Sequence, residues 1–332
     1  MESKMKILNL NKIIILSALF LSAIAFSNSA NALCVVNGDG AIVTVSGDSR
    51  TPVKDDTSRD ADSYTANSAT SDCYITPDIY KINFYKFGLC TADPDMNDLS
   101  SCQLFFDQAA GVEVDIQAGV SATLPIPEFY IEPGTYPYLY VLLSSKLGMQ
   151  WSGRMSNAVD GSSGDGNGGT YCWTSNTGMR ASNPPSDGSA MTTAHGTSLA
   201  GNVITLDCGT SEGTVATTYE VITKFSDSSC SSALAANGDK TTFDIEGVGS
   251  ARGIPTVNLL TTADAFATTC ANSAKIAWTT ALVTPYTVTE NSTFTMSIKA
   301  TGANNLEFSD GLDNNVLLLA SGAPRIYLTV TD

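Results

Sequence analysis

The chain has very few of the residues from which most catalytic and metal-binding sites are built. It contains one histidine, His195, among 332 residues, and none of its eight cysteines forms a C-x-x-C pair. Structural zinc sites, haem attachment and thioredoxin-type redox motifs depend on such residues and are therefore disfavoured. Any Ser-His-Asp triad must use His195. We expect no catalytic residues and no enzyme activity.

Positive charge and long apolar runs are also scarce. The chain has 17 Lys and Arg against 33 Asp and Glu, a formal net charge of −16. Such a charge repels phosphate backbones, so nucleic-acid binding is not expected. A spanning helix needs about 20 apolar residues. Beyond the N-terminus no segment reaches that length, so we expect no transmembrane segment in the mature chain.

The N-terminus has the order of a secretory signal peptide. Lys4, Lys6 and Lys12 precede an apolar run over 13–26, which is followed by the small-residue site 30–32. Cleavage near Ala32 places the mature protein outside the cell, in the periplasm or at the cell surface. Removal of residues 1–32 takes away three Lys and one Glu, leaving 14 basic and 32 acidic residues and a net charge of −18.

Apolar residues at every second position predict an all-β fold of antiparallel strands with one buried face. The segment 136–143 is apolar on both faces and is expected to be a central strand. The alternating runs are Tyr80-Ile82-Phe84, Val112-Val114-Ile116, Phe294-Met296-Ile298 and Ile326-Leu328-Val330.

The length of the mature chain favours two domains. Between 153 and 200 the composition shifts to Gly, Ser, Asn and Thr, which is typical of a linker or a long exposed loop. We therefore expect two β-sandwich-like domains, over 33–152 and 201–332, joined by this polar segment.

An even number of cysteines in an exported chain favours disulfides over metal sites. Four cysteines fall on each side of residue 153. Eight cysteines allow 105 pairings. The pair Cys90–Cys102, which closes a short acidic loop, is the strongest expectation, and the remaining choices are Cys34–Cys73, Cys172–Cys208 and Cys230–Cys270.

The segment Glu132-Pro-Gly-Thr-Tyr136 resembles the tyrosine corner of immunoglobulin-like and transthyretin-like sandwiches. The resemblance implies that the Tyr136 hydroxyl bonds to nearby backbone. Together with 77–80, 88–91 and 101–102, the segment is also similar to uncharacterised exported β-rich proteins of marine bacteria. That second resemblance covers the N-terminal half and implies a compartment and a fold, without an activity.

Two acidic loops are candidates for Ca²⁺, which prefers hard oxygen ligands. One has Asp160, Asp165 and Asn167, although its spacing departs from that of an EF-hand loop. The other has Asp93, Asp95 and Asp98 within the loop between Cys90 and Cys102. Loops rich in Asp are more often simply solvated, so we expect no cofactor, with Ca²⁺ as the alternative.

The seven residues from His195 to Gly201 resemble the subtilase histidine motif H-G-T-H-x-A-G, and part of the same string resembles the serine motif G-T-S-x-A. One stretch cannot be both, because in subtilases the two motifs lie far apart on an α/β fold. Ser198 also stands where a second histidine belongs. We interpret the string as a turn, with a secreted hydrolase as the remote alternative.

Trp151 and Trp173 flank the polar segment, and an exposed ring there can stack on a sugar or on a partner surface. Partial burial against a disulfide is the more common role of such residues. The sequence therefore favours a structural or adhesive protein of a bacterial surface, which binds other surface proteins, itself or glycans. A secreted carbohydrate- or small-ligand-binding module is the alternative.

Reduction of the mature protein should destabilise both halves without releasing a metal ion, because the cysteines are expected to form disulfides. Thermal unfolding with and without reductant, together with metal analysis, measures this. Ellman titration of protein from the native source should find no free thiols, and a count of eight thiols would contradict the assignment.

Overall fold

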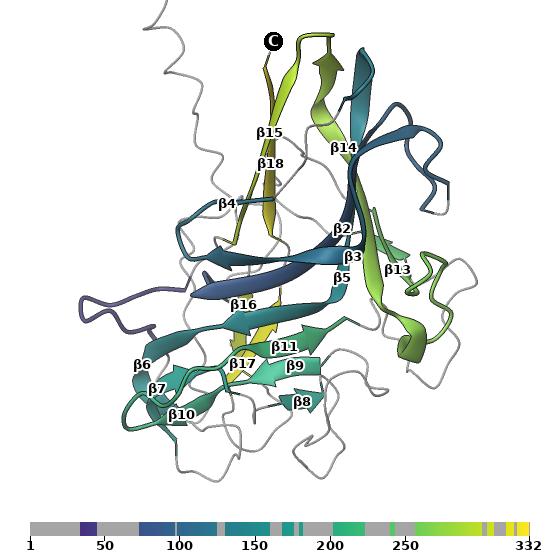
Figure 1. Ribbon diagram of the computed structural model, residues 1–332. Helices are drawn as coiled ribbons and strands as arrows, with labels where there is room; N and C mark the ends of the chain where they lie inside the picture. The colour runs from purple at the N-terminus through teal and green to yellow at the C-terminus, as the bar shows by residue number, and fades with distance from the viewer. Residues whose placement is uncertain are drawn as a thin grey trace, which may run out of the picture.

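The computed structural model describes residues 34–44, 73–96, 98–124, 130–159, 168–175, 179–181, 202–222, 240–242, 256–300, 304–308, 317–321 and 324–331. Its regular elements are β-strands, and the short 3-10 turn Cys270–Asn272 is the one helical turn in these ranges. The predicted all-β fold with antiparallel sheets is confirmed (Figure 1). Within the same ranges no helix is long and apolar enough to cross a bilayer. The predicted signal peptide lies outside them.

A seven-stranded antiparallel sheet, here called the central sheet, organises the molecule. Its order is β12 (Lys240–Thr242), β13 (Thr256–Leu260), β14 (Lys275–Val288), β5 (Gly134–Gln150), β2 (Ile79–Cys90) and β3 (Cys102–Gln117), with β11 (Thr218–Val221) also paired to β5. The apolar segment 136–143 lies in β5, between β2 and β14, so the predicted central strand is confirmed. In Figure 1, β2, β3 and β5 run together through the middle of the molecule.

Three smaller sheets contain the other strands. One has the order β1 (Cys73–Ile75), β16 (Asn304–Phe308), β17 (Leu317–Ser321), β9 (Asn202–Thr205) and β8 (Met179–Ala181). The second consists of β10 (Asp207–Gly209), β7 (Gly169–Trp173) and β6 (Ser152–Val159). The third consists of β18 (Arg325–Thr331), β15 (Thr293–Lys299) and β4 (Ala122–Thr123). The four runs with alternating apolar residues form β2, β3, β15 and β18, as expected.

The main core lies against one face of the central sheet, here called the inner face. Side chains of β2, β5 and β14 pack there with residues of β15, β17 and β18. Three phenylalanines of this core illustrate the packing, since the Phe87 ring lies 5.0 Å from that of Phe84 and 5.8 Å from that of Phe106. Full burial of one such side chain contributes about 1.5–3 kcal/mol to stability.

Irregular pairing in β2 determines which side chains reach the opposite, outer face. The register between β2 and its two neighbours shifts near Phe84 and Lys86. A bulge of this kind interrupts the two-residue period of a strand. As a result Phe84 and Phe87, three residues apart, are both in the main core. The two residues between them point to the outer face instead, where Tyr85 contacts Lys275 and Lys86 contacts Asp264.

The predicted tyrosine corner is present at the start of β5. The Tyr136 hydroxyl donates a hydrogen bond to the backbone carbonyl of Glu132 at 2.8 Å. The Tyr136 side chain is only 1% exposed, so the hydrogen bond satisfies the one polar atom of a buried ring. This contact fixes the direction in which the chain enters its longest strand.

Strand pairing joins segments from both sides of the predicted domain boundary. β5 lies before residue 153, yet it pairs with β14 over 134–144 and with β11 over 146–149. β4 also lies before residue 153, and it pairs with β15, which lies after residue 200. The sequence did not indicate these pairings, and the division into two domains stays a prediction.

A fragment of residues 33–152 tests that division. Without β11 and β14, one side of β5 loses its hydrogen-bonding partners, and an exposed apolar edge promotes aggregation. We expect the fragment to be unfolded or aggregated, as judged by circular dichroism and size-exclusion chromatography, whereas residues 33–332 fold. A monomeric fragment with cooperative unfolding would instead support two separate domains.

Candidate functional site

Three of the four predicted disulfides are present: Cys34–Cys73, Cys90–Cys102 and Cys172–Cys208. Cys90 lies directly opposite Cys102 across β2 and β3, and Cys172 lies opposite Cys208 across β7 and β10. Cys230 lies outside the described residues, so the pair Cys230–Cys270 stays a prediction. Such cross-links are typical of proteins in oxidising compartments, and they are compatible with an extracellular location.

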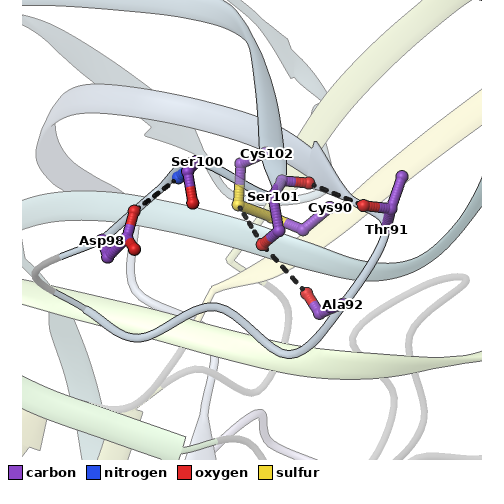
Figure 2. Close-up of a disulfide and its surroundings, with 7 residues drawn as sticks. All are labelled: Cys90, Thr91, Ala92, Asp98, Ser100, Ser101 and Cys102. Atoms are coloured by element: carbon purple, nitrogen blue, oxygen red, sulfur yellow. Dashed lines mark hydrogen bonds between the residues drawn. A yellow bond between two sulfur atoms is a disulfide. The ribbon is translucent and has the colours of Figure 1, made fainter.

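The acidic loop closed by Cys90–Cys102 is held as a compact turn (Figure 2). The Asp98 carboxylate accepts a hydrogen bond from the Ser100 backbone N–H at 2.9 Å, and this contact lowers the Asp98 pKa. The Asp98 backbone N–H in turn donates to the Asp95 carbonyl at 2.8 Å. Met96 is buried against the outer face of the central sheet. The local hydrogen bonds of Asp98 therefore support the turn itself.

Some of the residues proposed as metal ligands lie within the described residues, and others lie outside them. In the described part of the chain, no group of three or more His, Cys, Asp or Glu residues is placed to hold a metal ion. The candidate residues Asp160, Asp165 and Asn167, and the string from His195 to Gly201, lie outside the described residues. Calcium binding by Asp93, Asp95 and Asp98 stays a prediction.

The two tryptophans proposed as stacking residues are held by contacts within the protein. Trp151 is 5% exposed and belongs to the main core, with its ring against Gly153. Trp173 is half-buried, and a Cβ added to Gly213 would lie 2.2 Å from its ring. The third tryptophan, Trp278 of β14, is 2% exposed and belongs to the main core. Trp151 therefore presents no ring to solvent.

One end of the outer face is covered by two loops and contains an ion-pair network. The Asp264 carboxylate accepts a hydrogen bond from Lys86 of β2 at 2.8 Å and one from Lys275 of β14 at 2.6 Å. Lys275 also donates to the Thr262 carbonyl and lies 4.4 Å from the centre of the Tyr85 ring. The network ties the segment between β13 and β14 across the central sheet.

Asp264 is a strained position with a shifted pKa. Burial alone would raise the pKa of its carboxyl, but the hydrogen bonds from Lys275 and Lys86 outweigh that effect and lower it. The backbone of Asp264 has φ of 60°, which few residues other than Gly, Asn and Asp adopt. Nearby, burial raises the pKa of the Tyr140 hydroxyl, so this phenol stays protonated.

The other end of the outer face has more exposed side chains, and a row of four residues crosses four strands there. Asp115 of β3 lies opposite Lys81 of β2, Lys81 lies opposite Gly148 of β5, and Gly148 lies opposite Tyr219 of β11. A Cβ on Gly148 would lie 2.7 Å from the Tyr219 ring and 3.0 Å from Lys81 Cβ. The tyrosine ring therefore occupies the space above the glycine.

Charged groups surround this ring. Lys81 Nζ donates to both carboxylate oxygens of Asp115 at 2.8 Å and lies 3.9 Å from Glu113. The hydrogen bond with Asp115 raises the Lys81 pKa, so Lys81 stays charged at neutral pH. Lys146 Nζ lies 4.1 Å from the centre of the Tyr219 ring. The side chains of Asp115 and Glu113 are 49% and 55% exposed, so the carboxylates reach solvent. We call these six residues the Tyr219 row.

The Tyr219 row was not predicted from the sequence, in which tryptophans were the candidate stacking residues. The available signal was Gly148, because a glycine inside a strand often marks a close approach by another group. Nothing in the sequence indicated that Tyr219, about 70 residues later along the chain, supplies that group.

Comparisons with known proteins give no relative. No family model, no curated protein and no solved structure matches the chain. The resemblance to exported proteins of marine bacteria therefore stays a prediction.

Replacement of Asp264 by Asn tests the ion-pair network. Asn tolerates a positive φ, so the turn is kept while the charge is lost. We expect the free energy of unfolding at pH 7 to fall by about 1–2 kcal/mol, because buried Lys275 loses its counter-charge. Urea unfolding monitored by fluorescence measures this, with Asp93→Asn in an exposed loop as the matched control.

The difference in stability between the original protein and Asp264→Asn should change with pH in a definite direction. A lowered folded-state pKa gives stabilisation that is complete above the ordinary Asp pKa of about 3.9 and is lost as the pH falls through the folded value. The stabilities of the original protein and Asp264→Asn should therefore converge at low pH. A difference that persists unchanged at pH 2 would show that the charge is not responsible.

Proposed function

We propose that this is an exported protein of a bacterial surface or of the extracellular medium, which works by adhesion or assembly through direct contact. The N-terminal charge and apolar pattern and the three disulfides support export. The all-β architecture, with strands linked across several sheets, supports a structural role.

The observation that carries the proposal is the contrast between the two ends of the outer face. At one end, Met96 and the network of Asp264 pack loops onto the sheet. At the other end, the Tyr219 row places an aromatic ring among charged side chains that reach solvent. A sheet that presents an aromatic ring beside exposed charged side chains is suited to binding a partner.

A secreted carbohydrate-binding module is the second candidate. It is favoured by one specific feature, the Tyr219 ring held above Gly148. Aromatic side chains combine a large apolar surface with a polar tip, which suits them to contacts with sugars. Under this alternative the protein binds a free or insoluble glycan and need not be attached to a cell.

Fractionation and binding measurements test the proposal. We expect the protein in the surface or extracellular fraction, with the signal peptide removed, and we expect labelled mature protein to bind cells or its own kind. Native mass spectrometry gives its assembly state, and co-sedimentation with cells gives the binding. A mature protein that is monomeric and binds neither cells, glycans nor itself would contradict the proposal.

A further inference from the structure

The Tyr219 row differs in composition from the buried centre of a protein–protein interface. Its polar members are Lys81, Lys146, Glu113 and Asp115. The buried centres of protein–protein interfaces are depleted in Lys, Glu and Asp, because these charges are costly to desolvate. A partner that contacts charged side chains while leaving them hydrated fits the row better.

We propose that the Tyr219 row binds neutral polysaccharides, with the Tyr219 ring against the C–H face of a pyranose. This inference rests on the proposed function and adds to it a site and a class of ligand. Its first support is the placement of the ring. Gly148 leaves the space that the ring fills, and Lys81 Cβ borders the same space. The ring is therefore fixed on the sheet before any ligand arrives, which lowers the entropy cost of binding.

The second support is the pairing of hydrogen-bond donors with acceptors. Ammonium groups only donate, and ionised carboxylates only accept, whereas a hydroxyl does both. On one flank of the ring the row offers Asp115 and Glu113 beside Lys81, and Lys146 lies over the ring itself. The hydroxyls around a pyranose can satisfy both kinds of group. Lys146 is exposed, and the weak attraction between an ammonium and a ring at an exposed site lets it move aside.

The third support is the extent and the charge of the surface. Four neighbouring strands span roughly 14 Å, because strands in a sheet lie about 4.8 Å apart. The row therefore accommodates several sugar units along its length. The mature chain has 14 basic and 32 acidic residues, and its net charge of −18 opposes polyanions over the whole surface. Neutral chains are thus favoured over alginate-like or sulfated chains.

Co-sedimentation of the mature protein with insoluble polysaccharides tests the inference. The probes are cellulose, chitin, agarose and starch as neutral chains, and calcium-free alginate beads cross-linked covalently as the anionic chain. We expect retention on at least one neutral probe and none on alginate. Tyr219→Ala should weaken that retention by about tenfold or more, as expected for an aromatic residue at the centre of a contact.

Three variants separate loss of the site from loss of the fold. Tyr327→Ala is the matched control, because Tyr327 also lies beneath a lysine, at 5.3 Å from Lys299, but lies on another sheet. It should leave retention unchanged. Gly148→Val places a side chain where the ring lies and should weaken retention while Tyr219 is still present. Asp115→Ala alters an exposed acceptor and should weaken retention with normal thermal unfolding.

Each result has a definite consequence. Retention on alginate alone, or on no neutral probe, overturns the ligand class. Retention that is equal in the original protein, Tyr219→Ala and Gly148→Val overturns the site. If the protein binds cells but none of the neutral probes, the inference fails while the proposed function stands. Loss of binding to cells, to itself and to every glycan removes the proposed function as well.

Discussion

Pairing of β5 on both sides is the constraint on which the rest of the structure depends. This strand runs from Gly134 to Gln150 and has β2 along one side and β14 and β11 along the other. Its partners come from segments before and after the polar stretch 153–200. Both faces of β5 are also covered over 138–143, by the main core on one face and by a smaller hydrophobic cluster on the other, which explains why the strand is apolar at almost every position there.

The two faces of the central sheet have different roles because of that arrangement. Odd-numbered residues of β5, such as Leu139 and Val141, belong to the main core, whereas Tyr140 and Leu142 belong to a smaller cluster on the outer face. Met96 and the segment around Asp264 cover this smaller cluster at one end. At the other end the strands carry Lys81, Gly148 and Tyr219, beside the exposed carboxylates of Asp115 and Glu113. The outer face thus combines one end that is packed against loops with another end that carries exposed charged groups.

Local patterns in the sequence predicted local features well. Alternating apolar residues identified β2, β3, β15 and β18, and the spacing of Cys90 and Cys102 identified a disulfide. The Tyr136 hydrogen bond followed from a short motif. The Tyr219 row and the Asp264 network could not be predicted, because each joins residues that are brought together only by pairing of strands far apart in the sequence. The bulge near Lys86 also changes which face of the sheet the following side chains of β2 reach, and nothing in the residue pattern indicates this change.

The disulfides also determine how much of the chain can be drawn out under load. The bond Cys34–Cys73 bypasses a separation of 39 residues, which is about 130 Å of extended chain. The bond Cys172–Cys208 bypasses 36 residues, or about 120 Å. A protein pulled at its two ends transmits tension through these sulfur bridges and not through the bypassed segments. The bypassed lengths then add nothing to the extension of the chain, even after the sheets have opened.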